Sequence, residues 1–122
     1  SMVRGHFFEI PVLDLARAIR FYEVLFAISM EREVIDGNHY AHFPATDEGP
    51  GISGALAVGE SYVPSRAGTR IYLSAGSIDE TLARVVDLGG EILYPKTAIG
   101  VHGFVAEFAD SEGNCIALHE GA

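Results

Sequence analysis

The chain has little cysteine and few basic residues, and both shortages limit the compartments and partners that it can be expected to have. Its one cysteine, Cys115, cannot form a disulfide within the chain, which is typical of proteins in a reducing compartment. Only 8 Lys and Arg stand against 17 Asp and Glu, so the formal net charge is -9, and the basic residues form no stripe. That charge repels phosphate groups, so we expect neither nucleic acid nor an anionic membrane as a partner.

Long apolar runs and leader-like segments are also missing. No apolar stretch approaches the roughly 20 residues that a membrane-spanning helix needs, and the first residues lack the charged-then-apolar pattern of a secretory leader. Together with the single cysteine, this predicts a cytoplasmic protein whose partner is a small organic molecule. The 122 residues, 48% hydrophobic and 20% charged, fit one compact domain.

One pattern occurs twice in the chain, and the second copy begins 63 residues after the first. In each copy an alternating strand, residues 7–10 or 70–73, leads through a capping residue, Asp14 or Ser77, into an amphipathic helix. Three strand-like stretches follow each helix. The helix positions that repeat at this spacing are all apolar: Leu15, Ile19 and Tyr22, then Ile78, Leu82 and Val85. The sequence therefore predicts an α+β fold of two βαβββ modules.

Turn and loop signals set the expected boundaries. We place module 1 at about residues 3–59, a linker that contains Pro and Gly at about 60–69, and module 2 at about 70–119. The adjacent pair Asp36 and Gly37 predicts a tight hairpin turn. The expected helices are 15–27 and 78–88, and the expected strands are 3–11, 28–35, 38–44, 52–58, 70–75, 91–95, 103–109 and 114–119.

Two phrases carry a family resemblance that covers nearly the whole chain. The phrase FEIPVLDLARAIRFY at residues 8–22 and the phrase FADSEGNCIAL at residues 108–118 resemble recurring motifs of the vicinal oxygen chelate superfamily. This superfamily includes glyoxalase I, bleomycin-resistance proteins and extradiol dioxygenases. The resemblance implies that the modules form a curved mixed sheet with the helices on its convex face and a ligand on its concave face. It also implies a homodimer.

The same resemblance locates the positions at which metal-dependent members hold their ion. Carried over to this sequence, those positions are Phe7, Gly54, Arg70 and Ala117. None is a usual ligand, because divalent ions of this kind need imidazole or carboxylate donors and the charge of an Arg would repel the ion. We therefore predict no metal and no other cofactor, with a divalent ion at other residues as the alternative.

Strand alternation places Glu9, Leu56, Tyr72 and His119 on the concave face, one step from those positions. A carboxylate, a phenol and an imidazole that converge there could transfer protons. The same residues could instead form a satisfied polar cluster, which we favour, or bind a ligand without catalysis. We predict that Glu9 and His119 lie on the same cavity face and are coupled, and the three roles stay open.

Two classes of function fit this resemblance. As a binding protein of the glyoxalase/bleomycin-resistance type, the chain would hold a small organic molecule, and Arg70 would select an anionic group. As an enzyme it would resemble the lyases, isomerases or dioxygenases of the superfamily, with Glu9 or His119 as the base. The missing metal ligands favour binding or chemistry that needs no metal. The expected ligand contacts are Phe7, Met30, Leu56, Arg70 and Tyr72.

Overall fold

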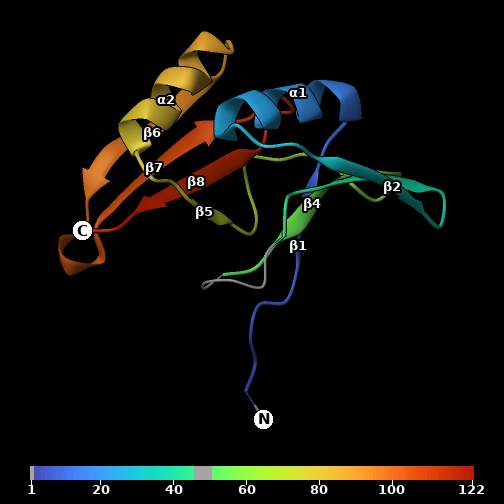
Figure 1. Ribbon diagram of the computed structural model, residues 1–122, viewed down its shortest axis with the longest axis horizontal. Coiled ribbons are helices and arrows are strands. Elements are labelled where there is room, and N and C mark those ends of the chain that lie inside the picture. Colours follow the sequence, from blue (N-terminus) through green and yellow to red (C-terminus); the bar gives the residue numbers. More distant parts are fainter. Residues whose placement is uncertain (1, 46–50) are drawn as a thin grey trace.

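The computed structural model describes residues 2–45 and 51–122 and contains the βαβββ pattern twice (Figure 1). Module 1 consists of β1 (Phe8–Pro11), α1 (Leu15–Phe26), β2 (Glu31–Ile35), β3 (Asn38–His42) and β4 (Gly54–Val58). Module 2 consists of β5 (Tyr72–Ser74), α2 (Ile78–Asp87), β6 (Glu91–Ala98), the short 3-10 helix η1 (Gly100–His102), β7 (Phe104–Ala109) and β8 (Cys115–Glu120). The predicted α+β fold of two modules is confirmed.

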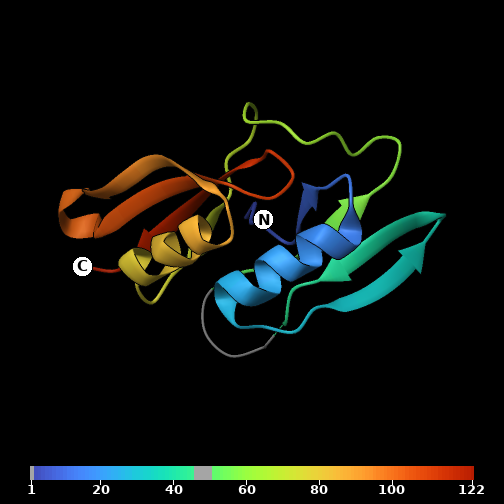
Figure 2. The same ribbon diagram turned by 90° about the horizontal axis from the view of Figure 1, so that it is seen from above.

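Each module contains one four-stranded sheet. The strand order is β1-β4-β3-β2 in the first sheet and β5-β8-β7-β6 in the second, with one parallel pair and two antiparallel pairs in each. Figure 1 shows α1 and α2 above both sheets, and in the view from above the two helices lie in front of the strands (Figure 2). The sheets are mixed and covered by helices as expected, but no backbone pairing joins them within residues 2–45 and 51–122.

Local sequence signals start both helices and form the β2–β3 hairpin at the expected residues. Asp14 and Ser77 each accept a hydrogen bond from the backbone N–H three residues later, at 3.0 and 3.1 Å, so both helices have side-chain N-caps. Asp36 and Gly37 both have positive φ, 50° and 77°, as the tight hairpin between β2 and β3 requires. Among the described residues no helix is long and apolar enough to cross a membrane.

The two modules share the main hydrophobic core. Apolar side chains of α1 and α2 pack against the sides of the sheets that face the helices, and each large side chain buried there stabilises the fold by about 1.5–3 kcal/mol. Because the core crosses the module boundary, separating the modules would expose it. Its fully buried members include Tyr22, Leu25, Leu56, Ile78, Phe108, Ile116 and Leu118.

The turn at residues 110–114 ties module 2 to the start of α1. The Tyr22 hydroxyl donates a hydrogen bond to Asp110 Oδ2 at 2.7 Å. The buried carboxylate of Glu112 accepts hydrogen bonds from two backbone N–H groups at the start of α1 and from the Arg17 guanidinium. Burial alone would raise the pKa of Glu112, but these hydrogen bonds outweigh it and lower the pKa to about 2. The turn at residues 110–114, which belongs to the second family-like motif at residues 108–118, therefore holds the two modules together.

Candidate ligand-binding site

The register of β4 differs from the one expected from the 63-residue repeat. Glu9 pairs with Ala55 and Ile10 pairs with Leu56, so Leu56 lies on the same side of the sheet as Ile10. That side faces the helices, and Leu56 is fully buried in the main core. The prediction that Leu56 lines the concave face and contacts a ligand is therefore wrong.

A difference of one residue between the modules explains the error. Tyr72 is the module 2 equivalent of Glu9, and it pairs with Ala117. Ala55 is therefore the equivalent of Ala117, and the two are 62 residues apart rather than 63. Consequently Gly54 also faces the helices, and Ala55 takes its place on the open side of the sheet.

The corrected register does not supply the metal ligands of the superfamily. The four positions become Phe7, Ala55, Arg70 and Ala117, and none offers an imidazole or a carboxylate. In the part of the chain that the structure describes, no group of three or more His, Cys, Asp or Glu side chains could hold an ion. The side chains present at these positions do not fit the divalent ion of the metal-dependent members.

A chain of hydrogen bonds fixes Glu9 on the open side of the module 1 sheet. The Tyr62 hydroxyl lies 2.9 Å from both Glu9 carboxylate oxygens and 3.1 Å from the Tyr40 hydroxyl. The carboxylate can only accept, so Tyr62 donates to Glu9 and accepts from Tyr40. The hydrogen bond with Tyr40, burial and the Glu9 carboxylate all raise the pKa of Tyr62, so its phenol keeps its proton.

An imidazole–carboxylate pair forms on the same side, between residues other than those predicted. His42 Nε2 lies 2.8 Å from Glu33 Oε1, and the His42 ring centroid lies 6.1 Å from that of Phe7 and 6.4 Å from that of Tyr40. His42 and Glu9 pair with the same β4 residue, so they share one side of the sheet. The alternation of β3 was the signal that could have placed Tyr40 and His42 there.

The charge of Arg70 is balanced within module 2. Arg70 Nη1 lies 3.0 Å from Glu107 Oε2, and the other oxygen of Glu107 lies 3.6 Å from Cys115 Sγ. Burial, then the charge of Glu107, raises the pKa of the Cys115 thiol, so the thiol stays neutral. Because Glu107 pairs with Arg70, the arrangement gives no support to the hypothesis that Arg70 selects an anionic group.

The structure does not bring Glu9 and His119 together. His119 lies on β8 in the second sheet, and its Nε2 lies 2.6 Å from the carbonyl oxygen of His102, to which it must donate. Glu9 lies on β1 in the first sheet and binds Tyr62 instead. No hydrogen bond or ion pair joins Glu9 to His119 within the described residues, so the structure shows no direct interaction that would couple them.

The remaining expected ligand contacts differ in their exposure. The side chains of Phe7 and Tyr72 are exposed, at 46% and 53%. Tyr72 pairs with Ala117 on the open side of the second sheet. Met30 instead is half-buried and packs against the main core beneath the helices. Met30 is therefore a core residue in the structure, whereas Phe7 and Tyr72 remain candidates for ligand contact.

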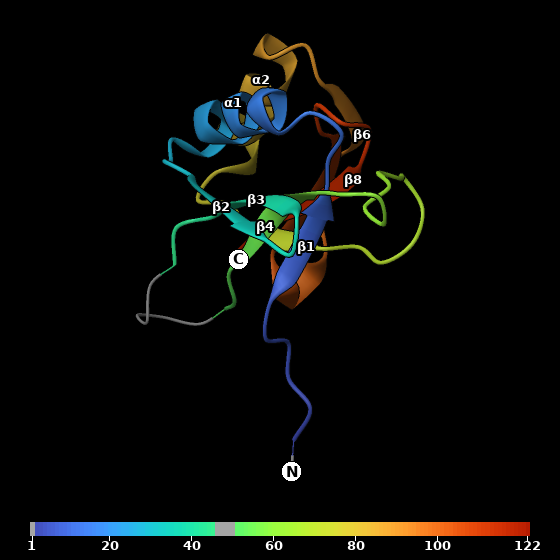
Figure 3. The ribbon, with the colours of Figure 1, turned by 90° about the vertical axis from the view of Figure 1, so that its right-hand side faces the viewer.

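A cavity of about 420 Å³, which we call the inter-module cavity, lies between β1, the linker and β8. Figure 3 shows the linker passing beside β1 and β8. Glu9 is the only charged residue among the described residues that line it. Each part of the chain contributes to the lining: Phe7 and Glu9 from module 1, Val63, Ser65 and Thr69 from the linker, and Cys115 from β8 of module 2.

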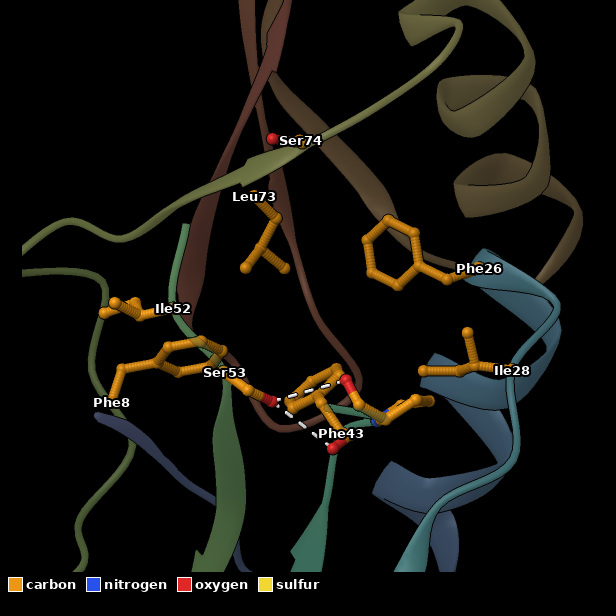
Figure 4. Close-up of a pocket in the computed structure, with 9 residues that line it drawn as sticks. Phe8, Phe26, Ile28, Phe43, Ile52, Ser53, Leu73 and Ser74 are labelled. Atoms are coloured by element: carbon orange, nitrogen blue, oxygen red, sulfur yellow. Dashed lines mark hydrogen bonds between the residues drawn. The ribbon is translucent and has the colours of Figure 1, made fainter. Parts of the chain in front are cut away.

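A second cavity, of about 360 Å³, lies on the helix-facing side between the modules (Figure 4). Its walls are mainly apolar, and the Leu73 side chain of β5 points toward the rings of Phe8 and Phe26. The Ser53 hydroxyl donates to the backbone carbonyl oxygens of Phe43 and Pro44, so its proton is already shared within the protein. No charged residue belongs to its described lining, so this cavity offers little to orient a polar ligand.

Solved structures with the same architecture identify the fold. The chain is similar to a glyoxylase/bleomycin resistance protein/dioxygenase domain from Frankia sp. EAN1pec, with a TM-score of 0.75, 19% identity and 100% of both chains covered. It is similar to an antibiotic binding protein from Streptomyces sp. CB03234, with a TM-score of 0.71, 17% identity and coverage of 100% of this chain and 98% of that chain. It is also similar to a fosfomycin resistance protein from Listeria monocytogenes, with a TM-score of 0.70, 22% identity and coverage of 99% and 94%.

No protein-family model and no curated protein matches the sequence. Identities of 17–22% show a common fold and do not carry function from one protein to another. The chain has the two-module fold of the vicinal oxygen chelate superfamily, as its two sequence phrases predicted.

Proposed function

We propose that this protein binds a small organic molecule in the inter-module cavity. The observation that carries the proposal is the cavity itself, because its volume of about 420 Å³ falls in the range of roughly 300–1,000 Å³ found for small-molecule sites. Its walls combine apolar side chains with a few polar groups, which is the usual composition of such sites. An antibiotic binding protein among the similar structures supports this use of the fold.

Residues from both modules would contribute to binding. Phe7 would offer an aromatic surface, and Glu9, held by Tyr62, would accept hydrogen bonds from the ligand. Tyr72 would extend the aromatic surface on the open side of the second sheet, and Arg70 would line it as an ion pair with Glu107. We also propose a homodimer, because a second copy would cover the apolar side chains that these open sides expose.

Binding by a panel of small organic molecules tests the proposal. Thermal shift would identify binders, and isothermal titration calorimetry would then compare wild type with Phe7→Ala. We expect Phe7→Ala to weaken binding by about tenfold, because it removes the aromatic wall of the cavity. Val86→Ala is the matched control, since Val86 is 56% exposed on α2. Equal affinities for Phe7→Ala and wild type would contradict the proposed location.

A metal-independent enzyme is the second candidate, and the hydrogen-bonded chain of Glu9, Tyr62 and Tyr40 favours it. Glu9 lines the cavity as a carboxylate, so it could remove a proton from a bound substrate while Tyr62 holds it in place. His119 is the other candidate base, because its Nε2 donates to a carbonyl and leaves Nδ1 to accept. Turnover that Glu9→Gln abolishes at saturating ligand would favour the enzyme over the binding protein.

A further inference from the structure

We propose that the ligand of the inter-module cavity carries a positive charge, as a protonated or quaternary amine, and that Glu9 is its counter-ion. This inference rests on the proposed function and adds the chemical class of the ligand to it. It depends on which charges the lining of the cavity contains and on which of them the protein already neutralises.

Glu9 brings a negative charge to the cavity that the protein does not balance. It is the only charged residue among the described residues of the lining. No ion pair of the described residues includes Glu9, and the group that donates to it is the neutral phenol of Tyr62. An ionised carboxylate can accept about four hydrogen bonds, so one donor leaves room for a ligand.

Two arginines that adjoin lining residues in the sequence are paired with other carboxylates. Arg66 and Arg70 each lie between lining residues in the sequence. Arg66 Nη2 contacts Glu91 Oε2 at 2.9 Å, and Arg70 Nη1 contacts Glu107 Oε2 at 3.0 Å. The Cys115 thiol, which also lines the cavity, stays neutral at physiological pH because burial raises its pKa. No basic side chain of the described residues pairs with Glu9, so its charge is open to water and to a bound cation.

The rest of the lining suits the organic part of such a cation. Phe7 presents an aromatic ring, and the electrons on the face of an aromatic ring attract a nearby cation. Val63 and Ile71 provide apolar wall for a hydrocarbon group. The net charge of -9 also raises the local concentration of cations, whereas an anion would be repelled before it reached Glu9.

Three probes of nearly equal shape test the sign of the charge: 3-phenylpropylamine, 3-phenylpropan-1-ol and 3-phenylpropanoate. We expect calorimetry with the full chain to show the amine binding at least about tenfold more tightly than the alcohol, and the carboxylate binding most weakly. Glu9→Gln should weaken amine binding by about 10- to 100-fold and change alcohol binding by less than about twofold. Added NaCl should weaken amine binding selectively.

Glu60→Gln is the matched control, because it makes the same change in net charge at an exposed residue outside the lining. It should bind all three probes as wild type does, and circular dichroism should show both variants folded. Alcohol or carboxylate binding as tight as amine binding would overturn the inference and leave the proposed binding function standing. Failure of all three probes and of the whole ligand panel to bind would overturn both.

Discussion

Replacing Glu112 with Gln tests whether the turn at residues 110–114 clamps the two modules together. The Glu112 side chain is fully buried, and its oxygens accept hydrogen bonds from the Arg17 guanidinium, the Ser111 hydroxyl and two backbone N–H groups. Glutamine has nearly the same shape, but it is neutral and replaces one acceptor oxygen with a donor. Arg17 is 47% exposed, so water can solvate its charge after the change.

The lowered pKa of Glu112 sets the expected magnitude. A fall from 4.5 to about 2 corresponds to about 3 kcal/mol of folding free energy at neutral pH. Between these two values the unfolded chain binds more protons at this group than the folded chain does. The stability that Glu112 contributes to the folded state is therefore complete above about pH 5. It decreases as the pH falls, and about 2 kcal/mol of it is lost by pH 3.

Urea unfolding followed by circular dichroism at pH 7 and pH 3 would measure this effect. We expect the free energy of unfolding of wild type to exceed that of Glu112→Gln by about 3 kcal/mol at pH 7 and by about 1 kcal/mol at pH 3. Glu60→Gln, at an exposed position, should match wild type to within about 0.5 kcal/mol at pH 7. A difference between wild type and Glu112→Gln that is absent at pH 7, or equal at both pH values, would refute the reasoning.

Four further measurements test other parts of the structure. Tyr22→Phe removes a buried hydrogen bond to Asp110 and should lower the urea-unfolding free energy by about 1.5–3 kcal/mol, whereas an unchanged midpoint would contradict that role. Leu56→Ala should cost about 2–5 kcal/mol because β4 buries this side chain in the core; a cost below about 1 kcal/mol would support the concave position instead. Elemental analysis of protein purified without chelator should find no stoichiometric Zn, Ni, Mn or Fe, and one ion per chain would disprove this. Light scattering should give about twice the chain mass of 13.1 kDa, a result that a monomer throughout the micromolar range would exclude.

The helices and the hairpin could be predicted because their signals are local. Asp14 and Ser77 cap the helices through backbone groups three residues away, and Asp36 with Gly37 forms the turn from its own dihedral preferences. The register of β4 has no such signal. It depends on how many residues separate the helix from the strand. The equivalent residues of β4 and β8 are 62 apart rather than 63, and this shift of one residue turns Leu56 from the expected concave side to the core.

The end of β6 shows a second limit of local signals. The strand was expected at 91–95, so its end was placed at Pro95, a residue that cannot donate to a sheet ladder. It continues to Ala98 instead, with register shifts on both sides of Tyr94. β6 is an edge strand, where proline can point its missing donor away from the neighbouring strand. Sheet position, which local sequence does not show, decides whether proline ends the strand.

The candidate site depends even more on distant partners. Phe7, Glu9 and Tyr72 were placed on the open sides of the sheets by strand alternation. Tyr62, which fixes Glu9, lies 53 residues further along the chain in a linker without periodicity, so no pattern indicated it. The partner of Arg70 was hidden in the same way, because Glu107 lies on a strand whose alignment with β5 only the fold defines.

Those partners also change the ligand that the site suggests. Seen alone in the sequence, Arg70 indicates an anionic ligand, since a guanidinium on a concave sheet would attract one. In the structure Glu107 neutralises Arg70, while Glu9 receives only a neutral phenol. The unbalanced charge at the inter-module cavity is therefore negative, and the favoured ligand changes from an anion to a cation. The proposal of a cationic ligand therefore depends on pairing between residues that are far apart in the sequence.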